Sequence, residues 1–209
     1  MRIFAAALIA AGALFAAETL AAFGYTWTVP DAGDWSVAQE DGATVLRLVK
    51  PREPNPSPRR PIQFALAGTS DFGNVTVEAD IKPLGHSVMV VFAYRDPAHF
   101  DYAHLSIDTA TQEPHHNGIF HVYGGERVRI SPVEGGAAFP DGNNRWYHVR
   151  LTREGSTGGV HVMVDGRDVP ALHAVDLSLR SGKVGLGSFD ETGEFKNVKI
   201  GGVEPRGHM

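Results

Sequence analysis

The last third of the chain alternates apolar and polar residues with a period of two, and this pattern constrains the fold more than any other feature. Residues 146–151 and 160–164 both place successive side chains on opposite faces. Strict alternation of this kind is typical of half-buried antiparallel strands and is incompatible with a helical period. The pair Asp165-Gly166 follows the second segment and favours the positive φ angles of a tight turn. This region is therefore predicted to contain a hairpin.

Similar patterns recur along the chain and predict an all-β protein of about a dozen strands. Further strands are expected at residues 35–39, 44–49, 62–67, 74–82, 88–94, 100–108, 118–123 and 127–131. Asp41-Gly42 is expected to form the turn between the first two of them. On the strand at 74–82, the residues expected to face the core are Val75, Val77, Ala79 and Ile81. The segment 88–94 is nearly continuous in apolar residues, which indicates a central strand covered on both faces. The segment 51–61 holds five prolines and is predicted to be an exposed loop, either a connector or one wall of a groove. A single two-sheet antiparallel β-sandwich follows.

Composition narrows the function classes. With 209 residues, 43% of them hydrophobic, the chain is long enough to bury the core of one domain. Its formal net charge of −5 argues against a nucleic-acid partner, which would favour a basic surface. The chain has no cysteine, so disulfides, thiolate metal sites and a cysteine nucleophile are excluded.

The N-terminal residues have one positive charge followed by an apolar alanine-rich and leucine-rich run. This pattern predicts a signal peptide within residues 1–22, cleaved between Ala16 and Ala22, and hence a secreted or periplasmic protein without a membrane span after cleavage. An uncleaved N-terminal anchor is the alternative. The β-sandwich domain is expected to cover residues 23–203, followed by a mobile tail at 204–209.

Histidines are concentrated in the middle of the chain, where six of the ten lie between residues 86 and 121. Alternation puts Tyr102 and His104 on one face of their strand. On the next strand Phe120 and Val122 are predicted to face the core, which would turn the neighbouring histidine and tyrosine outward. If these strands are adjacent, one polar face carries Tyr102, His104, His121, Tyr123, Arg127 and Arg129.

Such a face suits carbohydrate chemistry, because aromatic rings stack on sugars, arginine binds hydroxyls or carboxylates, and histidine transfers protons near neutral pH. We expect His104 or His116 to act as general acid or base, with Tyr102 or Tyr123 as the partner proton donor. Substrate contacts are expected from Tyr94, Arg95, Asn117, His121, Arg127 and Arg129. The simpler alternative is an ordinary polar strand face without a ligand.

The segment Glu113-Pro-His-His-Asn-Gly118 is predicted to be a loop that presents its side chains. One interpretation is a divalent metal site in which Glu113 and His115 or His116 combine with a strand histidine such as His104. The others are a sugar-contacting loop and a plain hairpin turn closed by Asn117-Gly118. A structural calcium ion at the acidic turn 190–194 is a further possibility for a cofactor.

Several stretches together resemble the laminin-G-like and concanavalin A-like superfamily. They are residues 72–81, 90–105, 146–151 and 164–167. Within that superfamily the chain is most similar to the 3-keto-disaccharide hydrolase-like proteins of secreted bacterial type, which are related to family-16 glycoside hydrolases. The resemblance implies a jelly roll and cleavage of glycosides or oxidised sugars, sometimes with a divalent metal. The acid pattern of the family-16 glucanases is missing, since Pro83 follows Glu78 and Asp80 without a third acid.

We therefore expect a protein that cleaves a glycosidic bond, by hydrolysis or by β-elimination, in an oligosaccharide or polysaccharide. A noncatalytic glycan-binding module and a cell-surface interaction domain are the alternatives. The sequence does not fix the sugar, its linkage or the oligomeric state.

Overall fold

A computed structural model describes residues 18–53 and 57–204 and consists almost entirely of strands. The expected leader residues 1–17 and the tail residues 205–209 lie outside the described residues. The strands are β1 Glu18–Ala22, β2 Tyr25–Val29, β3 Trp35–Glu40, β4 Ala43–Leu48, β5 Gln63–Ala67, β6 Asn74–Pro83, β7 Ser87–Asp96, β8 His99–Ser106, β9 Gly118–Tyr123, β10 Glu126–Arg129, β11 Tyr147–Arg153, β12 Gly159–Val164, β13 Arg167–Asp168, β14 Ala174–Val175, β15 Lys183–Ser188 and β16 Gly193–Val203.

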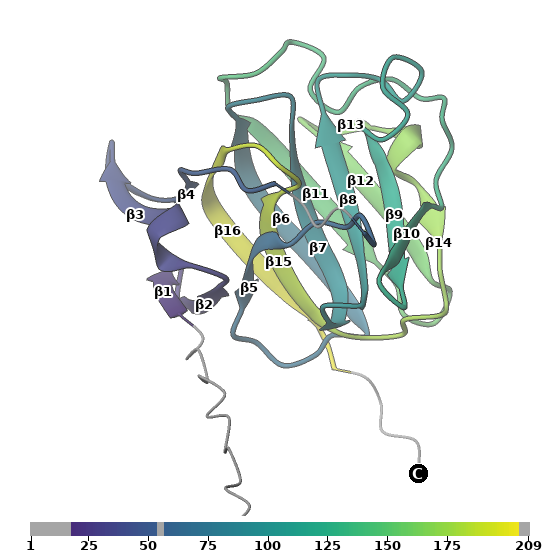
Figure 1. Cartoon of the computed structure of the whole chain (residues 1–209), viewed down its shortest axis with the longest axis horizontal. Coiled ribbons are helices and arrows are strands. Elements are labelled where there is room, and N and C mark those ends of the chain that lie inside the picture. Colours follow the sequence, from purple (N-terminus) through teal and green to yellow (C-terminus); the bar gives the residue numbers. More distant parts are fainter. Residues whose placement is uncertain (1–17, 54–56, 205–209) are drawn as a thin grey trace, which may run out of the picture.

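These strands form two antiparallel sheets packed face to face, which confirms the predicted sandwich (Figure 1). The first sheet has the order β1-β2-β5-β15-β7-β8-β9-β10, and the second β13-β12-β11-β6-β16-β4-β3 with β14 beside β12. The predicted central strand, β7, lies in the interior of the first sheet. No helix in the described part of the chain has the length and hydropathy needed to cross a membrane.

The predicted hairpin turns are present. Asp41 and Gly42, between β3 and β4, have φ angles of 49° and 78°. Asp165 and Gly166, between β12 and β13, have φ angles of 51° and 73°. Successive positive φ angles give a two-residue turn the twist that an antiparallel hairpin needs. Aspartate and glycine tolerate this conformation better than most residues, which explains why the local sequence predicted both turns.

The main core lies between the sheets, and a second apolar cluster lies on the outer face of the first sheet. The inner face of β6 contributes Val75, Val77, Ala79 and Ile81 to the main core, as predicted. The outer cluster consists of Phe64, Met89, Val91, Phe100, Tyr102, Phe120, Val122 and Phe189. The first sheet is therefore apolar on both faces, whereas the sequence analysis expected a polar outer face.

The second cluster overturns the predicted orientation of β9. Phe120 is paired with Tyr102 across the strands and shares its outer face, while Ile119 is paired with Ala103 and joins the main core. His121 and Tyr123 therefore lie on the face opposite Tyr102 and His104, so the predicted grouping of these four side chains is wrong. The sequence was ambiguous here because β9 carries large apolar residues on both faces.

Two further segments bear on the expected boundaries. β1 begins at Glu18 and pairs with β2 along its whole length, so the first sheet starts inside the range expected for the leader. The proline-rich segment forms no strand in its described residues, and Arg60 and Pro61 line an apolar groove of about 320 Å³ together with Tyr94. The segment therefore forms the wall of a groove, one of the two predicted roles.

Candidate functional site

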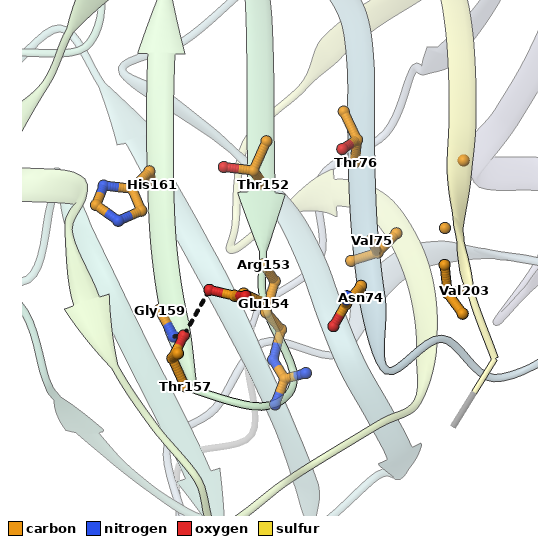
Figure 2. A pocket seen from close by; sticks show the side chains of 12 residues that line it. Asn74, Val75, Thr76, Thr152, Arg153, Glu154, Thr157, Gly159, His161 and Val203 are labelled. Atoms are coloured by element: carbon orange, nitrogen blue, oxygen red, sulfur yellow. Dashed lines mark hydrogen bonds between the residues drawn. The ribbon is translucent and has the colours of Figure 1, made fainter. Parts of the chain in front are cut away.

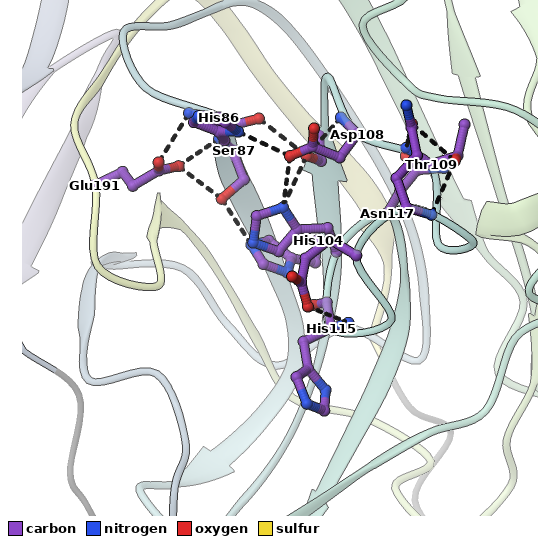
Figure 3. Close-up of polar contacts among 12 residues, drawn as sticks. His86, Ser87, His104, Asp108, Thr109, His115, Asn117 and Glu191 are labelled. Atoms are coloured by element: carbon purple, nitrogen blue, oxygen red, sulfur yellow. Dashed lines mark hydrogen bonds and ion pairs between the residues drawn. The ribbon is translucent and has the colours of Figure 1, made fainter.

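A polar hollow of about 560 Å³ lies where β7 begins, β8 ends and the loop before β9 passes. Its lining combines imidazole, carboxylate and amide side chains from three separate segments, as Figure 3 shows in part. The residues are His86, Asp108, Gln112, Glu113, His116, Asp190 and Glu191. Antiparallel pairing of β7 with β8 places their ends side by side, and the β15–β16 turn brings in the two acids. Such a hollow is open to a hydrophilic ligand.

Asp108 joins two histidines at the centre of this hollow. Its Oδ2 lies 2.8 Å from Nδ1 of His86 and 3.0 Å from Nδ1 of His116. The hydrogen bond to Asp108 raises the pKa of His86, with partial burial opposing it. Desolvation raises the pKa of Asp108, but the hydrogen bonds from both histidines outweigh it and the pKa is lowered overall. Asp108 is thus an anion that orients two imidazoles.

Glu191 anchors the start of β7 to the opposite wall of the hollow. Its Oε1 accepts a hydrogen bond from the backbone N–H of His86 at 2.8 Å, and its Oε2 accepts from the backbone N–H and the hydroxyl of Ser87. These contacts bridge segments more than one hundred residues apart in the chain. The carboxylate therefore fixes the backbone from which His86 projects into the hollow (Figure 3).

His104 lies beneath the hollow and cannot reach a ligand. It is 2% exposed, and its Nδ1 donates to the carbonyl oxygen of His115 at 2.8 Å while its Nε2 lies 2.8 Å from the Ser87 hydroxyl. Desolvation, together with the nearby His116, lowers the pKa of His104 to about 3. The structure therefore places this predicted catalytic base in the interior, as a neutral ring that supports the hollow.

Arg129 holds the loop that carries His116. Its guanidinium donates to the carbonyl oxygens of Pro114, His116 and Asn117, and it lies over the Phe120 ring at 4.9 Å. A Cβ atom at Gly118 would approach Arg129 Nη1 to 1.9 Å, so the close passage of the side chain requires glycine there. Arg129 was predicted to bind substrate, but both terminal nitrogens of its guanidinium are engaged by the protein.

The rest of the outer face is closed by aromatic and cationic side chains. Tyr102 is fully buried, and its hydroxyl lies 3.3 Å from Nη1 of Arg127. Desolvation raises the pKa of Tyr102 to about 12, which makes it a poor proton donor near neutral pH. Arg127 and Arg59 both lie over the Phe189 ring, at 4.5 and 5.2 Å. Arg127 is partly exposed, whereas Tyr102 is fully buried and its hydroxyl is not accessible.

The other predicted contact residues are dispersed. Asn117 is fully buried and ties its loop to the neighbouring segment through Gly136 and Ala138. Tyr94 lines the apolar groove described above. Arg95 is exposed and lies 3.3 Å from the Ser181 hydroxyl. Tyr123, which is 59% exposed, stacks against His121 on the opposite side of the sheet. Of the predicted catalytic and substrate-contacting residues, the structure therefore places only His116 in the lining of the hollow, while Arg127 lies over Phe189, the residue before Asp190.

The predicted metal ligands do not converge on one point. Glu113 lines the hollow, but His115 is exposed, and it contributes its backbone carbonyl to His104. The acidic turn expected to hold calcium is engaged with the protein. Glu191 binds the start of β7, and Glu194 pairs with Arg47 and Lys82. Two of the three carboxylates at this turn, those of Glu191 and Glu194, therefore already have close partners in the described structure.

The sequence analysis missed the residues that organise the hollow, namely His86, Asp108, Glu191 and Ser87. The local enrichment in histidine indicated this region of the chain. Alternation within a strand, however, does not predict which side chains meet at the ends of neighbouring strands. The contribution of Glu191 had no signal in the local sequence, since its partners belong to a strand far away in the chain.

A second hollow, of about 500 Å³, lies on the outer face of the second sheet (Figure 2). Thr76, Thr152 and His161 occupy neighbouring register positions on β6, β11 and β12. Its acid, Glu154, accepts a hydrogen bond from the Thr157 hydroxyl at 2.9 Å (Figure 2). This hollow presents one imidazole and mainly neutral groups, so it offers less acid–base chemistry than the histidine–aspartate hollow.

Comparison with known proteins identifies the fold. No protein-family profile and no curated protein matches the chain. Among solved structures, the carbohydrate-binding module CBM66 from Bacillus subtilis is 20% identical, covers 83% of this chain and 94% of its own, and superimposes with a TM-score of 0.60. A glycosyl hydrolase-like protein from Parabacteroides distasonis is 16% identical and superimposes with a TM-score of 0.56, over 83% of this chain and 92% of its own. A Bacillus subtilis protein of unknown function with a galectin-like fold is 16% identical and superimposes with a TM-score of 0.52, over 86% of this chain and 90% of its own. The chain therefore has the concanavalin A-like jelly-roll fold.

Proposed function

We propose that the hollow around Asp108 binds a carbohydrate. The observation that carries the proposal is the pair of imidazoles oriented by one carboxylate, in a water-accessible hollow with further acids and an amide on its walls. Sugar hydroxyls both donate and accept hydrogen bonds, so they suit a mixture of carboxylate acceptors and imidazole donors. The fold likeness to a carbohydrate-binding module and to a glycosyl hydrolase-like protein supports the same class of ligand.

The geometry favours recognition by hydrogen bonds over stacking. Asp108 fixes Nδ1 of His86 and of His116, which leaves Nε2 of each ring for a ligand. Gln112 and Glu113 add an amide and a carboxylate from the loop. Arg127 lies over the ring of Phe189, the residue before Asp190 in the lining of the hollow, and its guanidinium has donors beyond the one aimed at Tyr102, so we propose that it engages a uronate carboxylate of the ligand. Neutral or acidic glycans are therefore the expected ligands.

Hydrolysis of the bound glycan is the second candidate. Burial, reinforced by the neighbouring Glu191, raises the pKa of Asp190 and so favours its protonated form. Glycosidases pair one protonated acid with one ionised carboxylate across the scissile bond. Asp190 would be the acid and Glu113 the base or nucleophile, while His116 would orient the substrate. This assignment replaces His104, Tyr102 and Tyr123, which the structure keeps apart from the hollow.

The 3-keto-disaccharide hydrolase-like assignment, export from the cell and removal of an N-terminal leader belong to this proposal as well. A β1 strand that starts at Glu18 is compatible with cleavage at or before Ala17, because cleavage after Ala22 would remove a strand from the first sheet. N-terminal sequencing of the exported protein tests this point.

The proposal predicts loss of glycan binding when the hollow is altered. A glycan array of neutral and uronic oligosaccharides first identifies a ligand, and titration calorimetry then gives its Kd. We expect Asp108→Asn and His116→Ala to weaken binding by about 10- to 100-fold, because each removes hydrogen bonds to or around a charged group. Asp80→Asn and His148→Ala are matched controls, since they alter another exposed aspartate–histidine pair, 3.0 Å apart on the second sheet. The controls should bind with wild-type affinity.

Product analysis on the same samples separates binding from cleavage. Reducing ends that appear with wild-type protein and fall by about 10²- to 10⁴-fold in Asp190→Asn establish the hydrolase. Binding without product would show that the protein is a noncatalytic binding module. Equal affinity in the hollow variants and the controls, with all proteins folded by circular dichroism, contradicts a glycan site in this hollow.

A further inference from the structure

A second polar cluster lies on the inner face of the first sheet, away from the hollow. Asp101 and His121 are register partners on β8 and β9, and Asp176 follows β14 in the connection to β15. Among the residues that the structure describes, these three bring one potential ligand atom each to within 4.8 Å of one another. They come from segments separated by tens of residues, so the cluster is built by the tertiary fold and is not a local acidic run.

The Asp101 carboxylate supplies an independent indication that a ligand is needed. The residue is fully buried, and its Oδ1 lies 2.6 Å from Nδ1 of His121, while its Oδ2 is buried without a hydrogen-bond partner in the described structure. Desolvation raises the pKa of Asp101 to about 6, against the lowering effect of His121. A buried carboxylate oxygen without a partner is costly, and a bound cation is one of the few groups that can compensate it.

The surroundings orient the other two side chains towards the same point. The hydroxyl and the backbone N–H of Ser178 donate to Oδ1 of Asp176, at 2.6 and 3.1 Å. Oδ2 of Asp176 accepts a hydrogen bond from the backbone N–H of Leu179 at 3.3 Å and lies 3.8 Å from Nδ1 of His121. On the far side of the ring, Nε2 of His121 lies 3.3 Å from the Ser178 hydroxyl. A metal-bound histidine usually donates its other ring N–H to such an oxygen, which fixes its tautomer and orientation.

Arg153 does not neutralise the two acids by direct contact. Its guanidinium donates to the carbonyl oxygens of Gly73, Leu179 and Arg180. This places a fixed positive charge near the cluster but leaves both carboxylates available as ligands. The negative charge of two ionised carboxylates exceeds the positive charge of one arginine, so the cluster favours a divalent cation. The side chains of His121 and Asp176 are 12% and 16% exposed, which gives an ion access from solvent.

We propose that Asp101, His121 and Asp176 form a binding site for a first-row divalent metal ion of the Zn²⁺ type. One imidazole and two carboxylates suit Zn²⁺, which accepts nitrogen and oxygen ligands in four-coordinate sites, with water as the fourth ligand. Ca²⁺ prefers six to eight oxygens and is a poorer match for this set. The ion would tie the segment after β14 to the edge region of the first sheet and stabilise the fold. The site is independent of the glycan hollow and of its proposed function.

Zn²⁺ added alone to metal-stripped full-length protein tests this site. We expect one equivalent to bind in calorimetry, a rise in Tm of several degrees at saturation, and an X-ray absorption spectrum with one imidazole nitrogen among short nitrogen and oxygen ligands. Asp176→Asn should weaken binding by more than about 100-fold, since loss of an outer-shell group alone costs roughly 10- to 100-fold. Asp168→Asn is the matched control, because Asp168 pairs with a single histidine, His173, at 2.7 Å.

Three results would overturn the proposal. They are no Zn²⁺ binding by folded wild-type protein, unchanged binding in Asp176→Asn, and binding of Ca²⁺ in preference to Zn²⁺. If Asp176→Asn fails to fold, the absorption spectrum of the wild-type protein decides, because a site with no histidine ligand, or with two or more, is not this one.

Discussion

Replacing Arg129 by methionine should lower the free energy of unfolding by about 3 kcal/mol and abolish glycan binding. The guanidinium donates to three loop carbonyls, and because Arg129 is only partly buried we expect each hydrogen bond to contribute about 1 kcal/mol, below the roughly 1.5–3 kcal/mol of a charged hydrogen bond that water cannot replace. Methionine keeps the apolar contact with Phe120 but offers no donor. The loop that presents His116 would then lose its anchor. Urea unfolding gives the stability, and calorimetry with the array-identified glycan gives the binding.

Arg127→Met is the matched control for stability, because Arg127 lies on the same strand and face. It makes one hydrogen bond, to the Tyr102 hydroxyl, and none of the loop contacts. We expect it to cost about 1 kcal/mol. Equal losses of stability in the two variants would show that Arg129 does not anchor the loop and would remove the structural basis for the placement of His116.

The stability of the wild-type protein should fall with acid more steeply than that of His104→Gln. Burial depresses the pKa of His104 to about 3 in the folded state, whereas an unfolded histidine has its usual value near 6.5. The unfolded state therefore binds the proton first, so the stabilising contribution is present above about pH 6.5 and is lost progressively as the pH falls towards 3. Between pH 7 and pH 5, the wild-type protein should lose about 2 kcal/mol more than the variant.

Urea titrations at several pH values measure this difference directly. His148→Gln is the control, because it removes a largely exposed ring on the second sheet, away from the hollow. Parallel curves for wild type and His104→Gln would mean that His104 is not held neutral in the folded protein. The account of a buried ring beneath the hollow would then be wrong.

The sequence predicted the sandwich because most strands expose only one face to the core. β6 and β11 alternate cleanly between buried and more exposed residues, so alternation identified both as half-buried strands. The predicted orientation of β9 was wrong because Ile119 and Phe120 point to opposite faces and both are buried. Its outer face is covered by side chains from other segments, such as Phe189, and alternation contains no information about a covering that comes from elsewhere in the chain.

The candidate site was predicted only in part for the same reason. The histidine enrichment correctly indicated the region, and His116 and Glu113 do line the hollow. The burial of His104 and the anchoring by Glu191 depend on contacts between strand ends that are far apart in sequence. Similarly, Asp176 meets His121 only through the course of the connection before β15. Spacing along the chain cannot reveal such pairs.

The most direct test of a glycan site in the hollow is an NMR titration of the imidazole nitrogens in unmodified protein with the array-identified glycan. If the glycan binds in the hollow, the ring resonances of His86 and His116 shift together along a binding curve with the calorimetric Kd. The ring resonances of His148 and His161 on the second sheet stay constant. Shifts at His148 or His161 with unchanged His86 and His116 would contradict the account and move the glycan site to the second sheet.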